Sequence, residues 1–98
     1  MKPTVLHPEA DLEAREAAYW YERQRTGLGR AFRFDLEAAL ERVKNKPQQY
    51  GVDLEPFRVC PLHRFPYTLH YLELSEMIWI LAVAHQSRRP GYWQDRMN

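Results

Sequence analysis

The spacing of the apolar residues changes once along this 98-residue sequence, from a helical period to the alternation of a β-strand. In residues 8–24 and 30–45, apolar side chains recur at intervals of three and four residues, as in helices that bury one face. The segment between them, residues 26–29, is short and contains two glycines, so we expect an antiparallel helical hairpin. The helical period ends at the loop 46–51, and the second half of the chain is expected to supply a sheet.

Three strand-like segments follow this loop, and a fourth precedes the first helix. The four segments are Thr4–His7, Phe57–Cys60, Tyr67–Leu74 and Met77–Ala84. Met77–Ala84 is apolar on both faces and is expected to be the central strand, whereas alternation in Tyr67–Leu74 places His70 on the solvent face. The predicted fold class is α+β, with the order β-α-α-β-β-β: a helical hairpin packed on a small sheet, then a short C-terminal tail over residues 86–98. We expect one domain, spanning residues 1–98.

The composition limits the kinds of site that the chain can hold. Its one cysteine, Cys60, excludes an internal disulfide and a cysteine-based zinc cluster, and we expect it in the core. The histidines lack metal-ligand spacing, and no cofactor or metal is predicted. The N-terminal segment has no signal-peptide pattern, and the longest apolar run is too short to cross a bilayer. We therefore expect a cytoplasmic protein without membrane contact.

Charge is almost balanced, with 14 Lys and Arg residues against 13 Asp and Glu residues and a net charge of +1. Domains that hold nucleic acid mainly through a basic surface usually carry a large cationic excess. The balance therefore disfavours that class of protein. The small positive excess lies in residues 56–98, the strand-rich part of the chain.

Two segments carry a more specific pattern. Arg64-Phe65-Pro66-Tyr67 leads into the alternating strand, and the last apolar strand ends in His85 with Arg88-Arg89-Pro90 beyond it. Together with the order of the elements, these segments resemble the RelE/ParE family, the toxins of bacterial type II toxin–antitoxin systems. The resemblance, which is closest to ParE-like members, runs from about Val5 to Trp93.

The resemblance implies a mainly antiparallel sheet beneath the helical hairpin and a cognate antitoxin that wraps the toxin with a flexible segment. We expect that segment to be acidic and apolar and to become ordered on binding. ParE-like members of the family poison DNA gyrase, RelE-like members cleave mRNA on the ribosome, and some relatives have no assigned target. Operator DNA is expected to be bound only through the antitoxin.

For an RNase-type member, the resemblance implies that Arg64, His85 and Tyr92 are catalytic. A guanidinium stabilises charge at the scissile phosphate, and an imidazole near neutral pKa transfers the proton. Each residue also has a structural alternative. Arg64 would pair with a helix carboxylate or lie in solvent, His85 would hydrogen-bond a neighbouring backbone group, and Tyr92 would pack against the sheet.

Contacts with a protein partner are predicted on the first helix, at the entry to the alternating strand and in the tail. The residues are Tyr19, Trp20, Arg64, Arg88, Arg89 and Trp93. Three consecutive aromatic residues, 19–21, cannot all face one core from a helix, so at least one is expected to be exposed. The alternatives are a solvated pair for Arg88 and Arg89 and burial for Trp93.

The balanced charge is unlike that of the ribosome-dependent nucleases, so we predict a ParE-like toxin that inhibits growth by binding DNA gyrase and is not an enzyme. Two alternatives stay open: a RelE-like ribosome-dependent mRNA endonuclease, and a non-toxic relative that only binds partners.

Overall fold

The computed structural model describes residues 1–97, except for the side chain of Asp53, and its elements follow the predicted order. The last residue of the predicted tail, Asn98, lies outside the described residues. The elements are β1 (Thr4–Leu6), α1 (Pro8–Gln24), α2 (Leu28–Asn45), β2 (Val52–Leu54), β3 (Phe57–Pro61), β4 (Tyr67–Glu73), β5 (Ile78–His85) and a 3-10 turn, η1 (Gln94–Met97).

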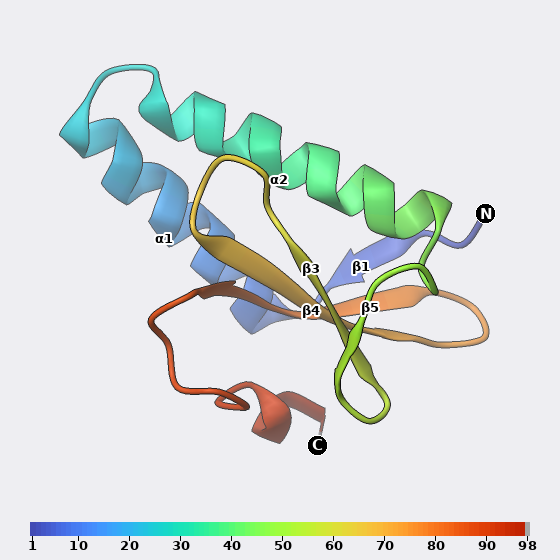
Figure 1. Cartoon of the computed structure of the whole chain (residues 1–98). Coiled ribbons are helices and arrows are strands. Elements are labelled where there is room, and N and C mark those ends of the chain that lie inside the picture. The colour runs from blue at the N-terminus through green and yellow to red at the C-terminus, as the bar shows by residue number, and fades with distance from the viewer. Residues whose placement is uncertain (98) are drawn as a thin grey trace.

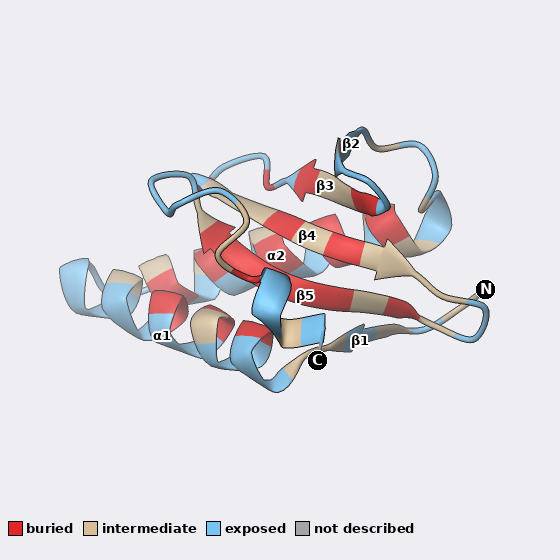
Figure 2. Cartoon of the chain, turned by 90° about the horizontal axis from the view of Figure 1, so that it is seen from below, coloured by how far each residue is buried: buried red, intermediate tan, exposed pale blue. Residues whose placement is uncertain are grey.

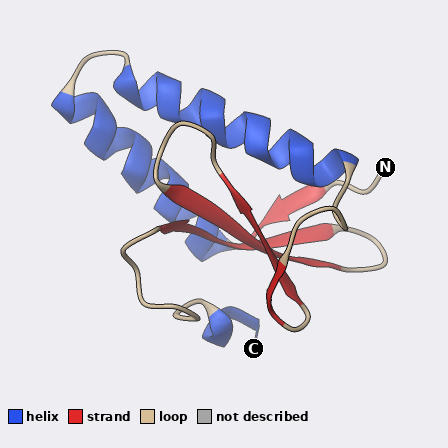
Figure 3. Cartoon of the chain, in the orientation of Figure 1, coloured by secondary structure: helices blue, strands red, loops and turns tan. Residues whose placement is uncertain are grey.

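The strands form one sheet in the order β1-β5-β4-β3-β2. The pair β1 and β5 is parallel, and the three other pairs are antiparallel. The two helices cover one face of the sheet, and the tail crosses the other face (Figures 1 and 3). This arrangement confirms the predicted α+β fold with a helical hairpin on a mainly antiparallel sheet.

Two details of the predicted sheet were wrong. The sequence predicted no strand in residues 52–54, but β2 pairs with β3 there and forms one edge. Met77–Ala84 was predicted to be central. The strand formed there, β5, is buried along most of its length and interior, but β4 holds the middle position because β2 extends the sheet on its far side.

The hairpin turn depends on two glycines and one carboxylate. Gly27 has a φ of 91°, a left-handed conformation that residues with a side chain rarely adopt. The Glu22 carboxylate accepts the backbone N–H groups of Gly27 and Gly29 at 3.0–3.1 Å, which fixes the entry into α2. A Cβ at Gly29 would lie 2.5 Å from the carbonyl oxygen of Ala18, so the two helices approach each other closely at this point.

The buried residues, coloured along the chain in Figure 2, form two apolar clusters: one includes residues of both helices and the other includes Trp93 of the tail. The larger one fills the space between the hairpin and the sheet, and it contains Cys60, as predicted. The smaller one lies beneath the tail and is built around Trp93. The prediction that His70 lies on a solvent face was therefore wrong, because the Trp93 ring covers it with the two ring centroids 5.0 Å apart.

Candidate functional site

A single carboxylate on α1, that of Glu13, holds the C-terminal tail against the sheet. Arg96 donates to it from both Nη1 and Nη2, each at 2.9 Å, and the Tyr92 hydroxyl donates at 2.5 Å. The backbone N–H of Val83, on β5, donates to the same carboxylate at 3.0 Å. One acidic side chain therefore joins α1, β5 and the tail.

The hydrogen bonds fix the protonation of this cluster. Burial alone would raise the pKa of Glu13, but the hydrogen bonds from Arg96, Tyr92 and Val83 outweigh it and lower the pKa below its ordinary value. Burial and the hydrogen bond to Glu13 raise the pKa of Tyr92 far above its ordinary value. At neutral pH, Glu13 is a carboxylate and Tyr92 a protonated phenol that donates to it. A phenol in this state is poorly placed to act as a general base.

Glu13 and Arg96 also hydrogen-bond the backbone of β5 beyond the point where its pairing with β1 ends. The His7 N–H donates to the Ile80 carbonyl at 2.8 Å, which is the last backbone bond on this edge that the structure gives between the two segments. Further along β5, Arg96 Nη1 donates to the Leu81 carbonyl at 2.9 Å. The Glu13 carboxylate accepts a hydrogen bond from the backbone N–H of Val83. Side chains thus satisfy backbone groups that an edge strand would otherwise expose.

Trp93 and Tyr92 anchor the tail by packing. Trp93 is 1% exposed, and its ring centroid lies 4.8 Å from that of Phe57. The Arg88 guanidinium carbon lies 3.9 Å from the centroid of the Tyr92 ring, as in a cation–π contact. In this conformation Trp93 offers no surface to a partner, which corresponds to the packing alternative for this residue. Arg89 is exposed.

The three residues of the RNase hypothesis do not converge on one site. His85 accepts the backbone N–H of Ser87 at Nδ1 (3.0 Å) and, with Tyr92, lines a hollow beside the tail. Arg64 lies on the β3–β4 loop, where its backbone N–H donates to Asp35 of α2 at 2.8 Å. Its side chain lines a separate hollow next to α2 that includes neither His85 nor Tyr92.

His85 also borders a hollow of about 390 Å³ between α1 and β5. Tyr67 forms one wall, with its ring centroid 5.1 Å from that of His85, and Trp20 and Arg88 line the same hollow. This volume lies within the range of small-molecule sites, and its lining combines aromatic rings with a cation.

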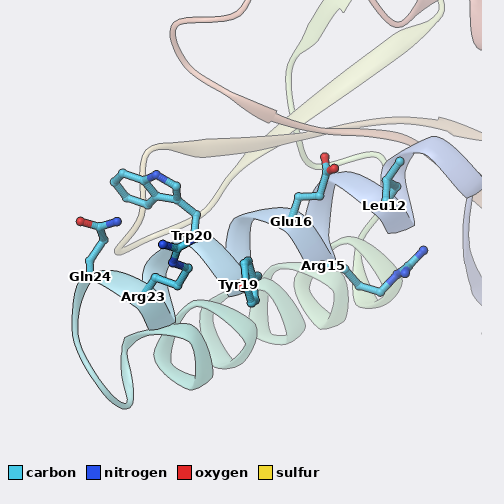
Figure 4. Close-up of a pocket in the computed structure, with 7 residues that line it drawn as sticks. All are labelled: Leu12, Arg15, Glu16, Tyr19, Trp20, Arg23 and Gln24. Atoms are coloured by element: carbon cyan, nitrogen blue, oxygen red, sulfur yellow. The ribbon is translucent and has the colours of Figure 1, made fainter.

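A second surface lies on the outward side of α1, beside an open hollow of about 650 Å³. Tyr19 is 65% exposed and Trp20 57% exposed, which confirms that the 19–21 run cannot be buried as a whole. Figure 4 shows Leu12, Glu16 and Trp20 along one edge of the helix, with Tyr19 on the neighbouring side. We call this exposed apolar strip, residues 12, 19 and 20 with the charged residues between them, the α1 surface.

Sequence reasoning missed Glu13 and Arg96. An acid near the start of a helix is ordinarily explained by the helix dipole, and an arginine in a polar tail has no distinguishing pattern. The two are 83 positions apart, and nothing in the sequence pairs them.

The sequence matches a known family model over most of its length. Residues 5–90 match the family model described as ParE toxin of type II toxin-antitoxin system, parDE. No curated protein matches the sequence significantly. In residues 1–97, the helices are too short or too polar to cross a membrane.

Proposed function

Since the chain belongs to the ParE family of toxins of type II toxin–antitoxin systems, we propose that it inhibits growth by binding DNA gyrase in the cytoplasm and not by cleaving RNA. Family membership also implies a cognate antitoxin as its partner.

The separation of the RNase-type residues is the observation that carries this choice. Cleavage through the 2′-hydroxyl needs an acid, a base and a phosphate-binding cation within hydrogen-bond reach of one phosphate. Here the Tyr92 hydroxyl is engaged by Glu13 at 2.5 Å, and Arg64 lies beside α2, outside the hollows that His85 lines. A toxin that acts by binding a protein needs no such assembly.

Purified chain added to DNA gyrase is expected to reduce supercoiling of relaxed plasmid and to trap cleaved plasmid, in proportion to dose. Premixing the chain with its antitoxin is the control and should restore supercoiling. Unchanged supercoiling without cleavage complexes, in a preparation that still binds antitoxin, would contradict gyrase as the target.

The hollow that contains His85, Tyr67 and Arg88 is the observation that favours the alternative, an mRNA endonuclease. Primer extension on translated mRNA after induction would then show cuts positioned by codon. These cuts should disappear in His85→Ala, and their absence from the wild type would exclude the alternative.

The α1 surface is the region that we assign to the antitoxin. Large exposed aromatic side chains on one helix are typical of interface residues that carry much of the binding energy. Trp20→Ala is expected to weaken antitoxin binding at least about tenfold, measured by isothermal titration calorimetry. Val52→Ala removes an exposed apolar side chain from β2, far along the sheet order from β5, and is the matched control. Equal affinities of the two variants would contradict the assignment.

A further inference from the structure

The outward side of α2 carries a second apolar feature, separate from the α1 surface. Phe34 is 78% exposed, more than any other large apolar side chain of the described residues except Met1. It borders a hollow of about 460 Å³ whose lining includes Ala31, Arg30 and Arg64. We call this the Phe34 hollow, and none of its lining residues lines the hollow at the α1 surface.

The one carboxylate in the lining of the Phe34 hollow is already occupied. Asp35 accepts the backbone N–H groups of His63, Arg64 and Phe65, at 3.3, 2.8 and 2.9 Å. These bonds orient the carboxylate toward the β3–β4 loop and fix that loop on α2. Asp35 is therefore a positioning group for the loop, and among the described residues it forms no ion pair with an arginine side chain.

The two arginines of the Phe34 hollow remain available. Neither Arg30 nor Arg64 forms an ion pair with a carboxylate that the structure describes, and both are exposed. The Arg64 guanidinium carbon lies 5.6 Å from the centroid of the Phe65 ring. This contact leaves the guanidinium N–H groups free to donate two parallel hydrogen bonds to one carboxylate. Although the net charge of the chain is only +1, the Phe34 hollow therefore has a local positive charge from the guanidinium groups of Arg30 and Arg64 beside the exposed Phe34 ring.

We propose that the Phe34 hollow docks an acidic segment of a partner protein, with one apolar side chain packed on Phe34 and carboxylates paired with Arg30 and Arg64. Aromatic residues and arginine are the residue types enriched at protein interfaces, and the sign of the free charges selects an acidic partner. A nucleic acid is the weaker candidate, because two phosphate contacts give little affinity at physiological salt. The proposal stands independently of the gyrase and antitoxin assignments.

The test uses the full chain and a fluorescein-labelled peptide of about twelve residues, made of Asp and Glu with one central Phe. Fluorescence polarisation measures affinity, and amide shifts in NMR spectra map the site. Phe34→Ala and Arg64→Ala are each expected to weaken binding at least about fivefold, with the largest shifts in residues 30–38 and 62–66. Both side chains are exposed, so the variants are expected to fold, which circular dichroism verifies.

Matched controls separate the site from general attraction to a cation. Lys46→Ala removes an exposed cation from the C-terminal end of α2, and Val52→Ala removes an exposed apolar group from β2; both should bind like the wild type. Replacing the central Phe of the peptide by Ala should weaken binding to the wild type but not to Phe34→Ala. The proposal is overturned if Lys46→Ala loses as much affinity as Arg64→Ala, if the shifts fall on α1 or the tail, or if a single-stranded oligonucleotide of equal length binds the hollow more tightly.

Discussion

At the scale of single residues, Glu13 shows how one side chain can act on distant parts of a small chain. Its carboxylate takes hydrogen bonds from two tail residues and from a backbone N–H of β5. Its side chain and that of Arg96 are each 13% exposed. Ion pairs that are this well shielded are strongly coupled, and removing one partner leaves the other charge poorly solvated. The tail conformation therefore depends on Glu13 being present and ionised.

Glu13→Gln is expected to lower the free energy of unfolding by about 2 kcal/mol at neutral pH, because it leaves the Arg96 guanidinium without a counter-charge. Urea denaturation followed by circular dichroism measures the change. The loss should grow smaller in acid. The pKa of Glu13 in the folded chain lies below its ordinary value of 4.5, so its stabilisation is complete above that value and is lost as pH falls through the folded-state pKa.

The control for this prediction is Glu16→Gln, an exposed position one turn along the same helix. It should change the free energy of unfolding by less than about 0.5 kcal/mol. Glu73, whose pKa is lowered by its hydrogen bond from Lys2, contributes an acid transition common to all variants. An equally steep acid transition in wild type and Glu13→Gln would show that Glu13 is not a source of it.

At the scale of elements, the sequence predicts those that bury one repeating face and fails for those whose position depends on distant contacts. The two helices and three long strands have periods that apolar burial enforces. The strand β2 does not, because three residues next to a loop that contains Pro47 and Gly51 give no usable period. The cluster beneath the tail could not be predicted from the sequence either. Burial of Trp93 places the tail against the sheet, and Arg96 can contact Glu13 only in that position. Exposure of the 19–21 aromatic run could be predicted, since a helix cannot bury three adjacent rings.

The packing of α1 on α2 gives a prediction at this scale. Gly29→Ala places a Cβ about 2.5 Å from the Ala18 carbonyl oxygen, which the backbone can relieve only by moving the helices apart. We expect a loss of about 1–3 kcal/mol in the free energy of unfolding, although alanine is the better helix former. Gly51→Ala, where an added Cβ meets nothing within 4 Å, is the control and should be nearly neutral. Equal effects of the two changes would contradict a close helix approach at Gly29.

At the scale of the whole molecule, the sheet is covered on both faces by elements of unequal size. The hairpin covers one face with a large continuous cluster, whereas the tail covers the other with one tryptophan and the polar cluster around Glu13. Local stability follows the number of buried apolar contacts. We therefore expect the tail to open at a lower free energy than the hairpin and the central strands.

Trp93→Ala tests whether the helical hairpin and the C-terminal tail, which pack on opposite faces of the sheet, unfold as separate cooperative units. Trp93 is 1% exposed and its truncation removes the largest side chain of the smaller cluster, a change that costs about 3–5 kcal/mol in a core. If the tail is a separate unit, hydrogen exchange should show protection lost by at least about 100-fold at Val83 and residues 92–97, but by less than about tenfold in α2. Trp20→Ala, which truncates a tryptophan that is 57% exposed, should leave both regions protected. An equal loss of hydrogen-exchange protection in α2 and in the tail of Trp93→Ala would mean that the chain opens as one cooperative unit. In that case, the sheet couples the packing of the tail on one face to the packing of the helices on the other.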